Sequence, residues 1–170
     1  MSIRTARPDD AAALASLINA AFVVEAFFKI GDRTSADEVA ALMEAGGEFL
    51  VLEGLPRRSG EAAKAGTGTG TRILIGCVYV KCSGERAYFG MLSIDPTRQR
   101  QGAGRRLVDA VESRARERGC RFMDLHLVDL REELTPYYRR LGYVECGTLP
   151  FSEPERASKP CFFIVMTKRL

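Results

Sequence analysis

The sequence contains few of the residues from which metal and disulfide sites are built. It has no tryptophan and a single histidine, His126. Its five cysteines form no C-x-x-C pair, and their number is odd. A closed zinc site would therefore need widely scattered thiolates, so we expect no metal site. We expect the cysteines to be free thiols in a reducing cytoplasm.

Long apolar segments and a strong excess of one charge are also missing. The first residues carry no apolar run of the kind found in signal peptides. No stretch approaches the ~18 consecutive apolar residues of a membrane-spanning helix. The net charge is only +3 at pH 7, which is too weak to indicate nucleic acid by itself. We therefore expect a cytoplasmic protein that binds neither a membrane nor nucleic acid.

The composition that remains is that of one folded domain. The chain has 170 residues, of which 46% are hydrophobic and 28% charged, as in ordinary globular proteins. We predict a single domain over residues 1–170. It is interrupted at about 55–71 by a Gly/Thr-rich segment with almost nothing to bury, which we interpret as a flexible insertion between two hairpin strands.

Hydrophobic periodicity predicts the elements of this domain. Apolar residues at helical spacing predict four helices. The first covers about 9–22, and the second begins at a capping box at 35–38 and ends at the glycines at 46–47. The third covers about 102–118, and the fourth is a short helix that ends near 141. Strands are predicted at 3–6, 49–52, 73–81, 87–94, 121–128, 143–148 and 161–167. The order indicates an α+β sandwich, with a mixed, mostly antiparallel central sheet of six to seven strands flanked by about four helices.

The most informative stretch follows the strand that ends at Ile94. A glycine-containing turn leads there into an amphipathic helix. Gly102 and Gly104 let backbone N–H groups approach a ligand closely, and a helix N-terminus favours an anion. Arg100 and Arg105 add positive charge. The stretch predicts a diphosphate cradle, although it contains neither a P-loop nor a G-x-G-x-x-G motif. The alternative is a plain tight turn before a helix.

Two motifs in this order resemble one family. Gln99-x-x-Gly102-x-Gly104 is similar to the Q/R-x-x-G-x-G/A coenzyme A signature of the GNAT superfamily of N-acetyltransferases. Residues 136–143, PYYRRLGY, resemble that family's tyrosine followed by Leu-Gly-Phe/Tyr. The element order is also similar over nearly the whole chain. The resemblance implies a GNAT-like fold, acetyl-CoA as cosubstrate, and transfer of its acetyl group to a primary amine by direct attack in a ternary complex.

The resemblance also implies which residues bind acetyl-CoA. The backbone of Leu92, Ser93 and Ile94 should pair with the pantetheine arm like an added strand. The pyrophosphate should be held by the loop that begins the long helix, which consists of Gln99, Arg100, Gln101, Gly102, Ala103, Gly104 and Arg105.

Tyr138 matches the family's tyrosine that protonates the departing thiolate. A phenol has a higher pKa than a thiol, so it can act as the donor. The alternative is that Tyr138 only packs beneath its helix.

The general base is less determined. Many family members carry a glutamate at the position of Tyr88, and some amino-terminal acetyltransferases carry one 12 residues before the tyrosine, which here is His126. Strand alternation supports His126, because it lies on the face opposite Leu125 and Leu127. The alternative is a strand histidine without a catalytic role.

The acceptor should be bound by residues 22–29, since this segment roofs the substrate cleft in the family. Glu25 and Phe28 are the candidate substrate-binding residues. Glu25 either binds a cationic amine or pairs with Arg33 or Lys29. The acceptor is predicted to be a small-molecule or peptide amine. A homodimer is compatible with the sequence. Two other functions stay open: a non-catalytic CoA-binding or regulatory module, and an RNA-binding basic domain.

Overall fold

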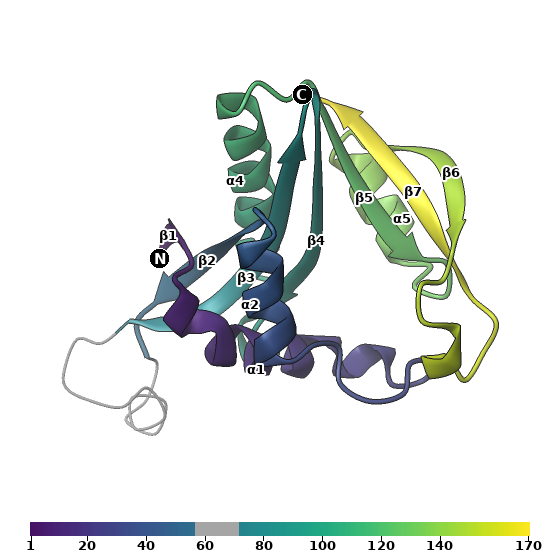
Figure 1. Ribbon diagram of the computed structural model, residues 1–170, viewed down its shortest axis with the longest axis horizontal. Coiled ribbons are helices and arrows are strands. Elements are labelled where there is room, and N and C mark those ends of the chain that lie inside the picture. The colour runs from purple at the N-terminus through teal and green to yellow at the C-terminus, as the bar shows by residue number, and fades with distance from the viewer. Residues whose placement is uncertain (57–71) are drawn as a thin grey trace.

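A computed structural model describes residues 1–56 and 72–170, which form a seven-stranded sheet in the order β1-β2-β3-β4-β5-β7-β6 (Figure 1). The strands are β1 (Ser2–Thr5), β2 (Glu48–Gly54), β3 (Ile73–Ser83), β4 (Arg86–Ile94), β5 (Phe122–Val128), β6 (Val144–Pro150) and β7 (Phe162–Arg169). The α-helices in the described part are α1 (Ala11–Phe22), α2 (Ala36–Glu44), α4 (Ala103–Glu117) and α5 (Leu134–Arg140). A 3₁₀ turn, η2 (Val23–Glu25), follows α1 directly.

The two faces of the sheet are covered by different helices. In β2, Phe49 and Val51 belong to the buried cluster that contains residues of α1 and α2, whereas Leu50 and Leu52 belong to the cluster that contains residues of α4 and α5. This alternation follows from the two-residue period of a strand. The sheet is therefore the middle layer of three, as the sequence predicted.

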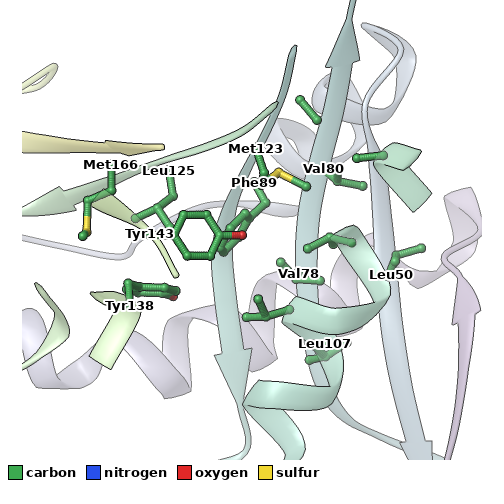
Figure 2. Packing of buried hydrophobic residues seen from close by; sticks show 14 of the residues in the cluster. Leu50, Val78, Val80, Phe89, Leu107, Met123, Leu125, Tyr138, Tyr143 and Met166 are labelled. Carbon is green, nitrogen blue, oxygen red and sulfur yellow. The ribbon is translucent and has the colours of Figure 1, made fainter. Parts of the chain in front are cut away.

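One strand pair divides the sheet into two halves. β4 and β5 are parallel and pair only from Arg86 to Tyr88, opposite residues 122–124. Every other neighbouring pair is antiparallel. Beyond Tyr88 the two strands diverge, so that the sheet opens like a V in Figure 1. Figure 2 shows Phe89, Met123 and Tyr143 packed together in the core where the halves meet.

The predicted architecture is confirmed, with small differences at the ends of elements. Helices and strands occur at every predicted place, and the sheet is mixed and mostly antiparallel. The segment at about 55–71 connects β2 and β3, which pair as an antiparallel hairpin. All but its first two residues lie outside the described residues. Among the helices of residues 1–56 and 72–170, none is long and apolar enough to cross a membrane.

Candidate active site

The diverging ends of β4 and β5 enclose a cavity of about 840 Å³. Its walls come from both halves of the sheet and from both helical layers. Residues of β4, β5, α5 and the N-terminus of α4 line it together with Phe22, Val24 and Arg33 from the end of α1 and the segment after it. The α1–α2 connection (residues 23–35) runs along the open end of the V in Figure 1. Its backbone pairs at Lys29 with Ala157, in the connection between β6 and β7.

The β4 wall of the cavity has an irregular backbone. Met91 has a φ of +51°, and the register with β3 shifts between Cys77 and Tyr79. A left-handed conformation at a non-glycine residue is uncommon. The hydroxyl of the buried Ser93 donates to the Met91 carbonyl at 3.0 Å. Because β5 pairs with β4 only as far as Tyr88, the β5-facing edge of β4 beyond this point is left for a ligand.

The N-terminus of α4 forms a second wall. Gly102 is its N-cap, with a φ of +78°, and a Cβ added there would meet no atom within 4 Å. A Cβ added at Gly104 would meet only the Tyr137 hydroxyl, at 3.8 Å. The open space above both glycines suits a ligand that approaches the backbone. The helix N-terminus and the arginines suit its negative charge.

The predicted acetyl-CoA site coincides with these two walls. Among the ten predicted residues, Ser93 and Gln101 do not line the cavity, and the others do: Leu92, Ile94, Gln99, Arg100, Gly102, Ala103, Gly104 and Arg105. An elongated, anionic thioester with a pantetheine arm fits this arrangement, because the chain offers a free strand edge and a helix N-terminus in one cavity.

Tyr138 lies in the cavity wall with its side chain 5% exposed. Its ring packs edge-on against Tyr137, with centroids 5.0 Å apart, and at a tilt against Phe89, with centroids 6.0 Å apart. Burial raises the pKa of the phenol well above its usual value. The hydroxyl therefore stays protonated at neutral pH and is available as a proton donor.

His126 also lines the cavity, from β5. Its ring lies 4.9 Å from Tyr88 and 6.0 Å from Phe163, measured between ring centroids. Burial lowers the pKa of the imidazole, although the nearby Asp124 carboxylate acts in the opposite direction. The predicted alternation of β5 is confirmed, since Leu125 and Leu127 are buried in the core on the other face. The lowered pKa favours the neutral form of the imidazole at pH 7, and this form can accept a proton.

The predicted internal partners of Glu25 are wrong. Its carboxylate receives a hydrogen bond from Arg131 Nη1, at 3.3 Å, while Lys29 pairs with Glu153 at 2.6 Å. Arg33 is near enough to lower the pKa of Glu25 but makes no hydrogen bond to it within the described chain; burial outweighs these charges and raises that pKa. The second carboxylate oxygen, Oε2, is buried and has no hydrogen-bond partner in the described part of the chain. The sequence could not indicate Arg131 as the partner because it lies 106 residues away.

Neither predicted acceptor residue lines the cavity. Glu25 lies behind Arg131, which does line it. Phe28 is completely buried in a small cluster with Val128 and Phe151. A role for either residue in acceptor binding stays a prediction.

Several cavity residues were missed by sequence reasoning. Arg33 is one of them, since it was considered only as a partner of Glu25. Others come from the C-terminal part: the pairing of β6 with β7 brings Leu149, Pro150 and Phe163 to the cavity, and Ser152 follows the end of β6. No local motif marks these positions. The described residues contain no cluster of three or more His, Cys, Asp or Glu side chains that could hold a metal ion.

Comparison with known proteins agrees with this geometry. The model of the acetyltransferase (GNAT) family matches residues 41–143. No curated protein matches the chain.

Solved structures resemble the chain over nearly all of its length. The ribosomal-protein-alanine N-acetyltransferase of Brucella melitensis is 19% identical, with 100% of both chains covered and a TM-score of 0.68. The yncA protein of Salmonella typhimurium, solved with acetyl-CoA, is 18% identical over 99% of this chain and 93% of its own, with a TM-score of 0.67. An aminoglycoside 6'-N-acetyltransferase complexed with coenzyme A is 18% identical over 99% and 97%, with a TM-score of 0.69. At this identity the likeness shows the fold, and the family model shows the membership: this chain belongs to the GNAT family of N-acetyltransferases, which transfer an acetyl group from acetyl-CoA to an amine.

Proposed function

We propose that this protein acetylates a primary amine by direct transfer, with His126 as general base and Tyr138 as general acid. One observation carries the proposal. Both side chains line the cavity that also contains the free edge of β4 and the N-terminus of α4. A donor and an acceptor of protons therefore stand beside the proposed binding site of acetyl-CoA, which would supply a thioester-activated acetyl group when bound.

His126 would act on the acceptor. An amine with a pKa near ~10.4 is protonated at neutral pH and must lose a proton before it can attack a carbonyl carbon. The neutral imidazole of His126 would take that proton at its ring nitrogen. Tyr88, at the position where many relatives carry a glutamate, cannot serve, because burial raises the pKa of its phenol.

Tyr138 would act on the leaving group. As the bond between the acyl carbon and sulfur breaks, the sulfur gains negative charge, and the phenol hydroxyl would donate its proton there. The backbone N–H near Leu92 would polarise the thioester carbonyl. This N–H lies where the bulge at Met91 turns the β4 backbone. Backbone amides of the α4 N-terminus would hold the pyrophosphate.

The extent of the domain, the class of acceptor, the location and the oligomeric state are further predictions. We propose that residues 1–170 form a single transferase domain and that the acceptor is a small-molecule or peptide amine. Cytoplasmic location and a homodimer stay predictions; the first rests on the five cysteines, all of them free thiols in the structure.

Binding and turnover together test the proposal. Calorimetric titration with acetyl-CoA should show saturable binding. Thiol release should then appear with some members of a panel of amino acids, polyamines, aminoglycosides and short peptides, and mass spectrometry should find one acetyl group added to the amine. Binding without thiol release for any amine would support a non-catalytic CoA-binding module. Absence of binding would contradict the cosubstrate site itself.

A further inference from the structure

The charged side chains that line the cavity carry mainly positive charge. Among the described residues that line it, four are arginines and none is Asp or Glu. Arg100 and Arg105 come from the loop and helix of the proposed pyrophosphate site. Arg33 and Arg131 come instead from the α1–α2 connection and from the segment after β5. The diphosphate accounts for the first pair of positive charges and leaves the second pair unexplained.

Of this second pair, Arg131 is already satisfied within the protein. It pairs with Glu25 at 3.3 Å and with Glu133 at 2.7 Å. Two carboxylates therefore neutralise its charge and fix its side chain. Arg131 contributes a wall to the cavity but little free positive charge.

Arg33 is different, because no carboxylate of the described chain forms an ion pair with it, and the nearby Glu25 interacts with it through charge alone. Its guanidinium lies over the Phe22 ring, with the central carbon 5.1 Å from the ring centroid. Its Nε is buried and has no hydrogen-bond partner among residues 1–56 and 72–170. The face of an aromatic ring attracts the cation, and this contact restricts the position of the guanidinium. A guanidinium held in this way keeps its hydrogen-bond donors available to an anion.

Arg33 lines the cavity near Tyr88, which contacts the proposed general base His126. Its charge lowers the pKa of the Tyr88 phenol, against the stronger effect of burial, so it lies near Tyr88. The Tyr88 ring in turn contacts the His126 ring at 4.9 Å. Arg33, Tyr88 and His126 all line the cavity, and Tyr88 lies near each of the other two.

We propose that the acceptor amine carries a carboxylate, as an α-amino acid does, and that Arg33 binds this carboxylate while the amine faces His126. The inference rests on the proposed function and narrows its acceptor class. Arg–carboxylate pairs form two parallel hydrogen bonds, which orient the bound molecule as well as attract it. Phe22, Val24 and Phe163, which line the same cavity, offer an apolar surface for the rest of the acceptor. A polycationic amine such as an aminoglycoside would meet an unpaired positive charge here.

The test compares L-α-amino acids with their primary carboxamides, using thiol release to measure kcat/KM. The carboxamide amine is the less basic of the two, so more of it is unprotonated at a given pH, and intrinsic reactivity favours the amide. We expect the wild type to prefer the free acid nevertheless. Arg33→Met should reduce kcat/KM for the acid by about tenfold to a hundredfold, the range expected for lost hydrogen bonds to a charged group. It should leave the carboxamide nearly unchanged.

Two further variants separate binding from folding. Arg33→Lys keeps the charge but loses the planar fork, so it should fall between wild type and Arg33→Met. Arg121→Met removes an arginine that is 57% exposed and pairs with Glu85 outside the cavity, and it should behave as wild type. Acetyl-CoA affinity and melting temperature should be similar in all four proteins.

The possible failures can be told apart. If Arg33→Met lowered the rates for acid and carboxamide equally, Arg33 would only support the fold or Glu25, and the inference would be overturned. A wild-type preference for carboxamides, polyamines or aminoglycosides would overturn it as well. In both cases transfer itself would persist. Absence of thiol release with every acceptor would instead contradict the proposed function, and this inference with it.

Discussion

At the scale of single residues, the proposed role of Tyr138 as proton donor can be tested directly by mutation. Tyr138→Phe removes the proton donor but keeps the ring that packs against Phe89 and Tyr137. We expect kcat to fall by about 10²–10⁴-fold if proton transfer limits the rate. The KM for acetyl-CoA should change little, because the hydroxyl acts mainly in the transition state. Steady-state kinetics measure both, and an unchanged kcat would leave Tyr138 with a packing role.

His126 makes a prediction about pH. Only the neutral imidazole can accept a proton, and its fraction increases as the pH rises through its pKa. Since burial lowers that pKa below the reference of 6.5, kcat/KM for the wild type should rise with pH and level off at or below neutrality. His126→Ala should remove this limb, and because the chain has one histidine, no other imidazole can replace it.

The acceptor amine can produce a similar limb, so the profile must be recorded with two acceptors of different basicity. A limb that belongs to His126 stays at the same pH for both. One that moves with the acceptor and persists in His126→Ala would assign deprotonation to the solvent or to another group, and His126 would be only a strand residue.

Residues differ in how far local sequence predicts them. The direction of His126 followed from the alternation of its neighbours, because the period of a strand is a local property. The partner of Glu25 did not follow, because Arg131 is brought to it by the packing of the α1–α2 connection against the segment after β5. No local signal marks Arg33, because its significance depends on which carboxylates pair with it in three dimensions: among the described residues, Glu25 lies near it but forms no ion pair with it.

At the scale of elements, the N-terminus of α4 is predicted to bind the pyrophosphate of acetyl-CoA, and a mutation there tests this. Gly104→Glu places bulk and negative charge where backbone amides should meet a diphosphate. We expect acetyl-CoA binding to weaken at least tenfold, or ~1.4 kcal/mol, as measured by calorimetric titration.

Gly104→Ala is the matched control. Its Cβ would meet only the Tyr137 hydroxyl, at 3.8 Å, which is an ordinary contact. The alanine variant should therefore fold normally and bind acetyl-CoA far better than the glutamate variant. Full binding by a folded Gly104→Glu protein would rule out this loop as the pyrophosphate site.

The elements themselves were largely predictable because their signals are local. Helix α2 is an example: Ser35 Oγ accepts from the Glu38 amide at 3.2 Å, and the Glu38 carboxylate accepts from the Ser35 amide at 3.0 Å. This reciprocal cap was evident in the sequence three residues apart. The bulge at Met91 was not, because a left-handed φ at a non-glycine residue depends on the strand beside it and not on its own side chain.

At the scale of the whole molecule, the cavity exists because the two halves of the sheet are joined over a short length and held apart beyond it. Pairing of β4 with β5 covers three residues on each strand. A second link between the halves is a largely buried polar group. The Tyr143 hydroxyl donates to Glu112 Oε1 at 2.9 Å, and Lys168 Nζ donates to both carboxylate oxygens at 2.8 and 2.9 Å. This group of three side chains connects α4, which packs on the half of the sheet that contains β4, to β7, in the half that contains β5.

This link predicts a loss of stability that is separable from ligand binding. Tyr143→Phe removes one hydrogen bond from a buried carboxylate and should lower the free energy of unfolding by about 1–3 kcal/mol. Lys168→Met removes the main cation of a Glu112 side chain that is 6% exposed, and the loss should be larger, about 3–5 kcal/mol. Denaturant unfolding measures both. None of these three side chains lines the cavity, so variants that remain folded should bind acetyl-CoA as the wild type does. Equal stability of the wild type and both variants would mean that the β4–β5 junction and the apolar core alone hold the two halves of the sheet together. Weakened acetyl-CoA binding in a folded variant would show that this link also sets the width of the cavity.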